Sequence, residues 1–280
     1  GHDRLSQRCM GDYWIYRENE LFLIFDAGAV AADQLPAHRH ADLLTIEASV
    51  ACQRLFVDTG TCCYEPGAMR NYCRSTAAHN TLQVDQAEQC DTWSSFRMGY
   101  RGHPASFCTG QQGGIVWAQA SHDAYRRHGV PCVTRWIAAV TGQGPWICID
   151  VADSRGTHQL SERLHLHPDV AAEFISCRLV RLCCAGRVLW LSLLGEPSGA
   201  SLKQAWYCPR FGEPERNTVV EWSVTAKGQA AMGWALWFSA SPGTARLARW
   251  NRKIQVEWAA AHGDSRHFVL SDLGHGDIAR

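Results

Sequence analysis

Short apolar runs, each ended by glycine, proline, asparagine or aspartate, recur along almost the whole of this 280-residue sequence. Hardly any window keeps apolar residues at helical spacing for three turns, so long helices are not expected. Short runs bounded by turn residues are typical of β-strands, and many in succession predict an antiparallel all-β fold. The predicted strands are residues 20–28, 42–50, 53–61, 80–85, 114–121, 133–140, 145–153, 162–169, 175–184, 187–195, 219–226, 232–240, 253–261 and 267–273.

Short connections indicate that strands adjacent in sequence also pair in the sheet. Ala185-Gly186 is one such connection, made of residues that tolerate positive φ. So many short strands exceed what one flat sheet holds, and we predict two large antiparallel sheets packed face to face as a β-sandwich. No repeat or low-complexity linker divides the chain. Residues 1–280 are therefore expected to form one domain, with residues 215–280 as a smaller C-terminal sheet portion.

Two long segments lack a strand pattern, residues 64–79 and residues 203–218. We expect both to be irregular loops. Binding and catalytic groups are disproportionately found on long loops that a rigid scaffold positions. Function is therefore expected on these two segments.

The charge balance excludes some classes of partner. Positive and negative side chains number 27 each, so the net charge gives no support for binding to nucleic acid or to an anionic membrane. No run of about 18 apolar residues is present, and no membrane span is predicted. The chain begins with neither methionine nor an apolar signal core, so we expect a fragment or a processed chain.

Cysteine is frequent but scattered. The 13 cysteines include adjacent pairs at 62–63 and 183–184 but no C-x-x-C motif, which excludes zinc ribbons and thioredoxin-type motifs. An odd number cannot be paired completely within one chain, and several of these residues lie in apolar runs. We therefore predict mostly free thiols that act as small hydrophobic residues.

A pair of histidines precedes one of the predicted strands. On a strand, His38 and His40 would face the same side, and two imidazoles with a carboxylate are a typical zinc set with one open position. Asp58 ends the following strand, but a tight turn at residues 51–52 would set it opposite residue 45, so a shared site requires the chain to bend near His40. His79 could supply a third nitrogen. Spacing alone leaves both readings open: metal ligands, or polar residues at strand ends.

A second His-x-His motif gives a different pattern. His165 and His167 alternate with leucine, as expected for a half-buried strand, so a structural or solvent-facing role is favoured. A metal-binding cupin barrel would need a glutamate three or four residues after the first pair. Asp42 is too close to His40 in the sequence and Glu47 is too far from it, so the cupin is a minor alternative.

Several separate motifs resemble those of the heparinase II/III-like family of polysaccharide lyases. They are FDAGAVAADQLPAHRHADLLTIEASV, QRLFVDTGT, YEPGAMRNYCRSTAAHNTLQVD, RLHLHPDV and WYCPRFG, in this order between about residue 12 and residue 212. Members of that family join an N-terminal helical toroid to a C-terminal antiparallel β-sandwich. The resemblance implies that this chain is the sandwich, without the toroid.

The resemblance also assigns roles to the histidine and aspartate residues. His38 matches a catalytic histidine, while His40, Asp58 and His79 match the ligands of a structural zinc ion. The implied reaction is β-elimination at a uronate, in which a base removes the C5 proton and the C4 oxygen departs. In the family a tyrosine and a carboxylate-neutralising residue come from the toroid. The isolated chain is therefore expected to be weakly active or inactive.

Other residues in the two long segments are candidates for binding substrate. Arg74 could pair with a carboxylate or sulfate, or could tie its loop to the sheet. Trp206 and Tyr207 could form a sugar platform, or could cover an edge of the sandwich. Tyr64 and Tyr72 could replace the missing tyrosine, although packing is the more frequent role for a tyrosine in such a loop.

Three functions follow from these observations. The first is the β-sandwich portion of a lyase that acts on uronic-acid-containing polysaccharide, with glycosaminoglycan, alginate and bacterial exopolysaccharide as candidate substrates. The second is a non-catalytic module that binds acidic glycans or docks to a helical partner. The third is another metalloenzyme built on a β-sandwich. The resemblance implies a periplasmic or extracellular setting, whereas many free thiols suit a reducing compartment.

Overall fold

The computed structural model describes residues 5–30, 34–142, 144–250, 253–261, 263 and 266–270. Strands account for 61% of the structure and helices for 5%, which confirms the predicted all-β class. The strands of the large sheets pair antiparallel, and two large layers face each other as predicted. Among the described helices, none is long and apolar enough to cross a lipid bilayer.

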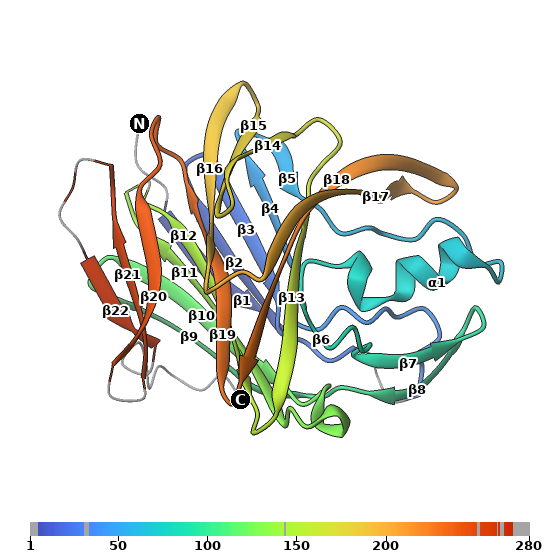
Figure 1. Cartoon of the computed structure of the whole chain (residues 1–280). Helices are drawn as coiled ribbons and strands as arrows, with labels where there is room; N and C mark the ends of the chain where they lie inside the picture. The colour runs from blue at the N-terminus through green and yellow to red at the C-terminus, as the bar shows by residue number, and fades with distance from the viewer. Residues whose placement is uncertain are drawn as a thin grey trace.

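Short strands follow one another along the chain, and the helical segments are few and brief (Figure 1). In chain order the elements are β1 (Leu5–Met10), β2 (Tyr13–Glu18), β3 (Leu21–Asp26), β4 (Ile46–Val50), β5 (Gln53–Phe56), α1 (Ala68–Arg74), η1 (Thr76–Ala78), β6 (Leu82–Val84), β7 (Cys90–Trp93), β8 (Arg97–Arg101), β9 (Pro104–Gln112), β10 (Ile115–His122), η2 (Arg126–His128), β11 (Cys132–Val140), β12 (Trp146–Asp153), β13 (Thr157–His165), β14 (Ala171–Ser176), β15 (Leu179–Cys184), β16 (Arg187–Leu194), β17 (Gly199–Arg210), β18 (Glu213–Lys227), β19 (Ala230–Trp237), β20 (Thr244–Trp250), β21 (Lys253–Ala259) and β22 (Arg266–Val269).

The middle layer is an eight-stranded sheet with the order β14-β15-β16-β19-β12-β11-β10-β9. Its central strands are apolar on both faces. In β12, Trp146 and Cys148 join the main core on one side, whereas Ile147 and Ile149 join a second core on the other side. A strand buried on both faces reads as a continuous apolar run, which explains why this part of the sequence shows little alternation.

A second layer covers one face of the middle sheet and is assembled from two smaller sheets. The five-stranded sheet β1-β2-β3-β4-β5 and the four-stranded sheet β17-β18-β13-β6 meet where Phe56 pairs with Leu166. The Val57 amide also donates to the His165 carbonyl oxygen at 2.9 Å. The segment that leaves β5 therefore lies beside the segment that leaves β13.

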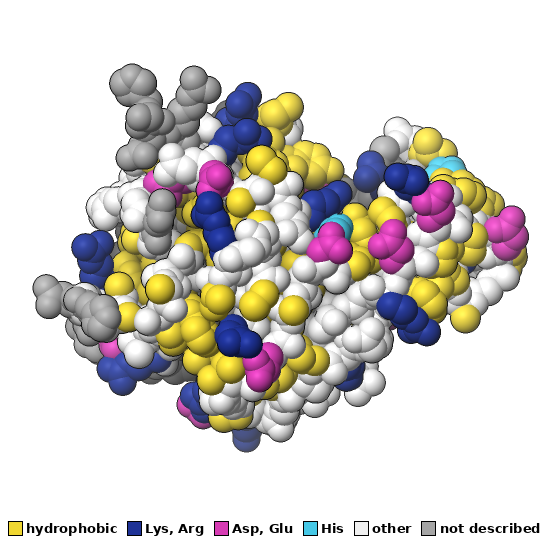
Figure 2. All heavy atoms as spheres, turned by 90° about the horizontal axis from the view of Figure 1, so that it is seen from above, with side chains coloured by type: hydrophobic (Ala, Val, Ile, Leu, Met, Phe, Trp, Pro, Cys, Tyr) yellow, Lys and Arg dark blue, Asp and Glu magenta, His cyan; other side chains and the backbone are white. Residues whose placement is uncertain are grey.

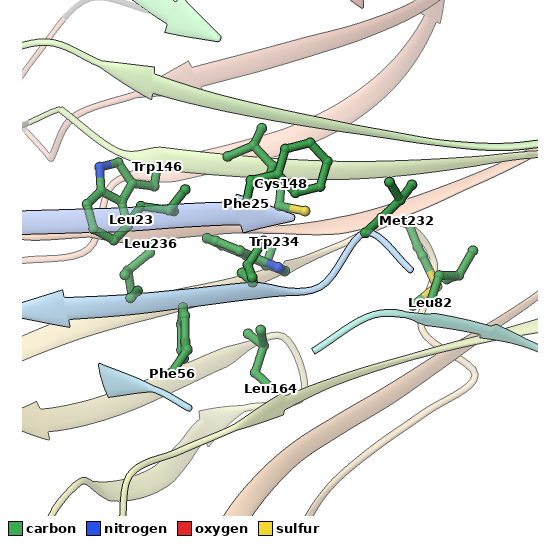
Figure 3. Packing of buried hydrophobic residues seen from close by; sticks show 14 of the residues in the cluster. Leu23, Phe25, Phe56, Leu82, Trp146, Cys148, Leu164, Met232, Trp234 and Leu236 are labelled. Carbon is green, nitrogen blue, oxygen red and sulfur yellow. The ribbon is translucent and has the colours of Figure 1, made fainter. Parts of the chain in front are cut away.

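The main core fills the space between these two layers (Figure 3). Phe25, Phe56 and Leu164 enter it from the second layer, and Trp234 and Leu236 enter it from β19 of the middle sheet. The rings of Phe56 and Trp234 meet edge to face with centroids 5.6 Å apart. Each of these five side chains is fully buried, and burial of one such side chain stabilises the fold by roughly 2 kcal/mol.

A third, three-stranded sheet with the order β20-β21-β22 covers the opposite face of the middle sheet. Val256 and Phe268 from this sheet join Ile115 and Trp117 of β10 in the second core. Within the predicted C-terminal portion, residues 215–280, β20, β21 and β22 form this third sheet, whereas β18 and β19 belong to the two main layers. The last predicted strand reaches residue 273, and residues 271–273 lie outside the described part of the chain.

Three local predictions are wrong. The supposed loop at 203–218 is a long hairpin, β17–β18, because Tyr207 and Glu215 still pair across it. The supposed loop at 64–79 contains α1 and η1, and the supposed single strand at 175–184 is the hairpin β14–β15. Strands β1, β2, β7, β8, β9, β17 and β20 were also missed. Much of β1, β7, β8, β9 and β17 is exposed, so their sequences lack apolar alternation.

Helix α1, the β7–β8 hairpin and the tip of the β17–β18 hairpin together form a lobe at one end of the sandwich (Figure 1). Cys62, Cys73 and Cys208 make a small core for this lobe, with Met69 and Tyr72 packed against it. All three thiols are free. Hydrophobic, acidic and basic side chains gather on its surface, at the right of Figure 2.

A buried arginine connects the middle sheet to the second layer. Arg135 of β11 donates from Nε and Nη2 to both carboxylate oxygens of Asp150, at 2.8 and 2.5 Å, and Nη2 also donates to Glu162. Its Nη1 donates to the carbonyl oxygens of Leu44 and Asn80, at 2.8 and 2.7 Å. Burial and the nearby Asp150 charge raise the pKa of Glu162 well above its usual value, so the protonated form is favoured more strongly in the folded protein than in the unfolded chain.

We expect Glu162→Gln to gain stability relative to the wild type as pH rises from about 5 to 7, by at most about 1.4 kcal/mol per pH unit. Folding of the wild type must place a proton on Glu162 that the unfolded chain has released in this range, and glutamine removes this requirement. Urea unfolding of both proteins across the pH range measures the difference. Glu196→Gln, at an exposed acid, is the control and should follow the wild type. Parallel curves for Glu162→Gln and the wild type would contradict the prediction.

Candidate metal centre

His40 lies just before a bend and not on a strand. β4 begins only at Ile46, so the assumption that His38 and His40 share the face of a strand is wrong. The bend that the sequence required is present, because the Thr45 amide donates to the Asp42 carbonyl oxygen at 3.1 Å. His40 is 8% exposed, whereas His38 faces solvent. The bend therefore separates the environments of the two histidines.

Asp58 follows the end of β5, where the chain turns toward the lobe. Its Oδ1 accepts a hydrogen bond from the Gly60 amide at 2.8 Å, which fixes the carboxylate against its own turn. Gly60 has a φ of 74°, and a Cβ at this position would lie 2.6 Å from the Cys208 carbonyl oxygen. Glycine is therefore required where the chain passes the β17–β18 hairpin.

His79 directly follows the short helix η1 and is fully buried. The next residue holds it in place. Asn80 donates from Nδ2 to the carbonyl oxygens of Ile46 and Val57, at 2.9 and 3.0 Å, and accepts from the His165 amide at 2.7 Å. The Asn80 side chain thus links the segment after His40, through Ile46, to the segment before Asp58, through Val57.

The structure brings the three predicted ligands together. One ligand atom from each of His40, Asp58 and His79 lies within 4.8 Å of the others. His79 Nδ1 and Asp58 Oδ2 are 2.5 Å apart, and the two imidazole ring centroids are 5.3 Å apart. His40 Nε2 also lies 3.3 Å from Thr61 Oγ1 and 3.5 Å from Arg70 Nη1. Neither Thr61 nor Arg70 was predicted from the sequence as a neighbour of this group.

The charges in this group are strongly coupled. Burial and the neighbouring His79 charge lower the pKa of His40 to about 3, so its ring is neutral. Burial opposes protonation of His79, but the Asp58 charge and hydrogen bond outweigh it and raise the pKa of His79 to about 9. Burial would raise the pKa of Asp58, but the same pairing with His79 lowers it. Burial raises the pKa of Asp42 to about 7.

The donor set fits a zinc ion. Zinc binds imidazole nitrogen and carboxylate oxygen at about 2.0–2.2 Å, commonly with three protein ligands and one open position. His40 offers a neutral ring, which is the form that binds a metal. Without a metal ion, the positive charge of protonated His79 offsets the negative charge of the Asp58 carboxylate. A cation at this point could take over that role, because metal binding releases protons from such ligands.

A second group with metal-ligand side chains lies inside the sandwich. Cys148, Asp150 and Glu162 also bring one ligand atom each within 4.8 Å of the others. Arg135 already supplies the positive charge there, with two hydrogen bonds to Asp150 and one to Glu162. This arrangement argues against a metalloenzyme with a metal inside the sandwich.

His38 lies at the surface of the lobe among aromatic rings. Its ring meets Tyr64 and Phe96 edge to face, with centroids 5.2 and 5.5 Å apart. Tyr64 was considered from the sequence and Phe96 was not. An exposed imidazole in this position is available for proton transfer to or from a bound molecule.

The predicted substrate-binding residues have different surroundings. Arg74 is 1% exposed and donates to the carbonyl oxygens of Arg39, Ser94 and Arg97, at 3.1–3.2 Å, which favours its alternative role of tying the loop down. Tyr207 is 5% exposed and packs against His167.

Trp206 stacks under the Arg216 guanidinium at 3.6 Å. These neighbours favour packing roles for Trp206 and Tyr207 as well. The second His-x-His motif also has a structural environment, because His165 is buried and its Nε2 lies 3.0 Å from the Ala77 carbonyl oxygen.

Comparison with known proteins identifies similar domains. The family model described as heparinase II/III-like, C-terminal, matches residues 9–235. A search of curated proteins finds no significant match. The heparan sulfate lyase HepC from Pedobacter heparinus has a TM-score of 0.73 and 12% identity, over 97% of this chain and 43% of HepC. A heparinase III has a TM-score of 0.74 and 12% identity, over 96% of this chain and 43% of that protein. The chain thus spans less than half of these proteins, and the likeness at this identity concerns the fold.

We expect Asn80→Asp to lower the free energy of unfolding by roughly 3 kcal/mol, because two buried carbonyl oxygens lose their donor and face a carboxylate instead. Urea unfolding of the variant measures the loss. Asn71→Asp makes the same chemical change at an exposed position of α1 and serves as the control. Equal stabilities of the two variants would show that Asn80 does not hold the ligand segments together.

Proposed function

The chain belongs to the heparinase II/III-like C-terminal family, as its motifs indicated, and on this premise we propose that it is the β-sandwich portion of a polysaccharide lyase. The proposed substrate is a uronic-acid-containing polysaccharide, and the proposed reaction is β-elimination. The observation that carries the proposal is the placement of His38. It is exposed beside aromatic rings, and only Arg39 separates it from His40, whose ring is buried in the candidate metal group.

The reaction needs a proton to move at two points. A base takes the proton from C5, next to the carboxylate, and the electron pair of that bond forms a C4–C5 double bond as the C4–O bond breaks. An acid then protonates the departing oxygen. His38 can act as base or acid, because imidazole exchanges protons near neutral pH. The ring of Tyr64, 5.2 Å away, brings a phenol next to the same space.

We propose zinc as the metal and His40, Asp58 and His79 as the residues that hold it. These residues come from the bend before β4, the turn after β5 and the segment after η1, which have no common strand. When bound, the ion would supply a fixed positive charge that joins these segments. The metal ligands would thereby orient the loop that carries His38.

The proposal includes a helical partner. The solved relatives are more than twice as long as the matched region, and the family resemblance assigns a tyrosine and a carboxylate-neutralising group to a toroid outside this sequence. We therefore expect low activity from this chain alone. A module that binds acidic glycans without cleaving them is the alternative, and product formation would exclude it.

We expect one zinc ion per chain after purification, and we expect His40→Ala to lose it, because two ligands hold zinc much more weakly than three. Elemental analysis of both proteins measures the metal. His103→Ala removes an exposed histidine outside the group and should retain zinc. Wild-type protein that remains metal-free when supplied with zinc would contradict the assignment.

We expect His38→Ala to retain zinc but to lower β-elimination by roughly 100-fold or more, the size of a general acid–base contribution. The assay follows the ultraviolet absorbance of the unsaturated uronate, with heparan sulfate and alginate as substrates at high protein concentration. Unchanged turnover in His38→Ala would remove His38 from the mechanism. Any unsaturated product from the wild type would exclude the non-catalytic module.

A further inference from the structure

Three aromatic side chains are grouped on the surface of the lobe. Tyr64, Phe96 and Phe211 are 39%, 45% and 59% exposed. The ring centroid of Tyr64 lies 5.5 Å from that of Phe96 and 5.0 Å from that of Phe211. We call these three residues the aromatic platform. Large rings in contact with one another, but left open to solvent, are unusual for side chains that only support a core.

The platform is assembled from three separate parts of the chain. Tyr64 follows the turn after Asp58, Phe96 lies between β7 and β8, and Phe211 lies in the turn between β17 and β18. That turn has Gly212 at a φ of 83°, and the Gly212 amide donates to the Cys62 carbonyl oxygen at 2.7 Å. The tip of the hairpin is thus anchored beside Tyr64, and Phe211 is held in place by backbone contacts that do not require an aromatic side chain.

A cation lies beneath two of the rings. Arg70 is fully buried, and its guanidinium carbon is 5.2 Å from the Tyr64 centroid and 5.8 Å from the Phe96 centroid. Nε donates to the Ser95 carbonyl oxygen at 3.0 Å, but Nη2 has no hydrogen-bond partner in the described structure. None of the ion pairs among the described residues includes Arg70. A buried guanidinium without a carboxylate is costly, and it leaves a positive charge under the platform.

We propose that Tyr64, Phe96 and Phe211 form a stacking subsite for a pyranose ring of an acidic polysaccharide, next to His38. The inference rests on the proposed function and specifies where the substrate binds. The C–H groups of a sugar face pack favourably on aromatic faces, which carry partial negative charge. The unpaired charge of Arg70 attracts a uronate chain and would repel a basic one.

The position of His38 gives the subsite its place in the reaction. His38 touches both Tyr64 and Phe96 at their edges, so a sugar stacked on the platform would reach the imidazole with its next glycosidic bond. The platform is therefore a positioning surface, and His38 remains the proposed catalytic residue.

The test measures binding by calorimetry, with size-defined oligosaccharides of heparan sulfate and of alginate as probes. We expect Phe211→Ala to bind about tenfold more weakly than the wild type, because one of the three rings of the platform is lost. Phe211→Trp should bind within about twofold of the wild type, because it keeps a ring at the same turn. Zinc content and the thermal unfolding midpoint should be unchanged in both variants, since Phe211 is the most exposed of the three rings.

The control is Ile175→Ala, which removes an exposed apolar side chain from β14, outside the lobe. Its affinity should equal that of the wild type. Wild-type affinity in Phe211→Ala would overturn the subsite and would leave the rings as a docking face for a helical partner. Failure of the wild type to bind either oligosaccharide would overturn it as well.

The outcome for the subsite is independent of the outcome for the reaction. Weaker binding in Phe211→Ala would support the platform, whether or not the wild type forms unsaturated product. Product formation with unchanged binding in Phe211→Ala would support the lyase and reject the platform.

Discussion

The buried guanidinium of Arg135 is the interaction on which the rest of the structure depends. Its two hydrogen bonds to Asp150 fix it to the middle sheet, and its remaining amino group reaches the carbonyl oxygens of Leu44 and Asn80 in the second layer. Those two carbonyls belong to the bend after His40 and to the residue after His79. A charge that could not be left unpaired inside the core thereby aligns two irregular segments that no strand pairing would hold.

The candidate metal centre is a junction of loops supported by buried polar side chains. Asn80 holds the backbones next to β4 and β5, and Arg74 ties the end of α1 to the β7–β8 hairpin. Each of these residues satisfies carbonyl oxygens that would otherwise be buried without a donor. The apolar layers determine where the sheets lie, whereas these few polar side chains determine where His40, Asp58 and His79 meet.

The sandwich could be predicted from the sequence because β12 and its neighbours are apolar on both faces. The three ligands could be named from motif resemblance, but their meeting depends on the bend after His40, which a shared site required and which spacing alone could not establish. Hairpin β17–β18 was taken for a loop because backbone pairing, and not apolar alternation, holds its exposed half. Phe211 and Arg70 were not predicted as functional residues, because a single exposed ring and a single buried cation form no periodic pattern in the sequence.

The β17–β18 hairpin joins the buried layers at one end and the exposed lobe at the other. Its base is part of the four-stranded sheet, while its tip contacts the segment after Asp58 through the Gly60 and Cys208 backbones. Insertions or exchanges at the two-residue tip would leave every buried layer intact. A change of residues at this one turn would therefore alter the exposed surface of the lobe while the packing of the layers, and with it most of the folding free energy, stayed the same.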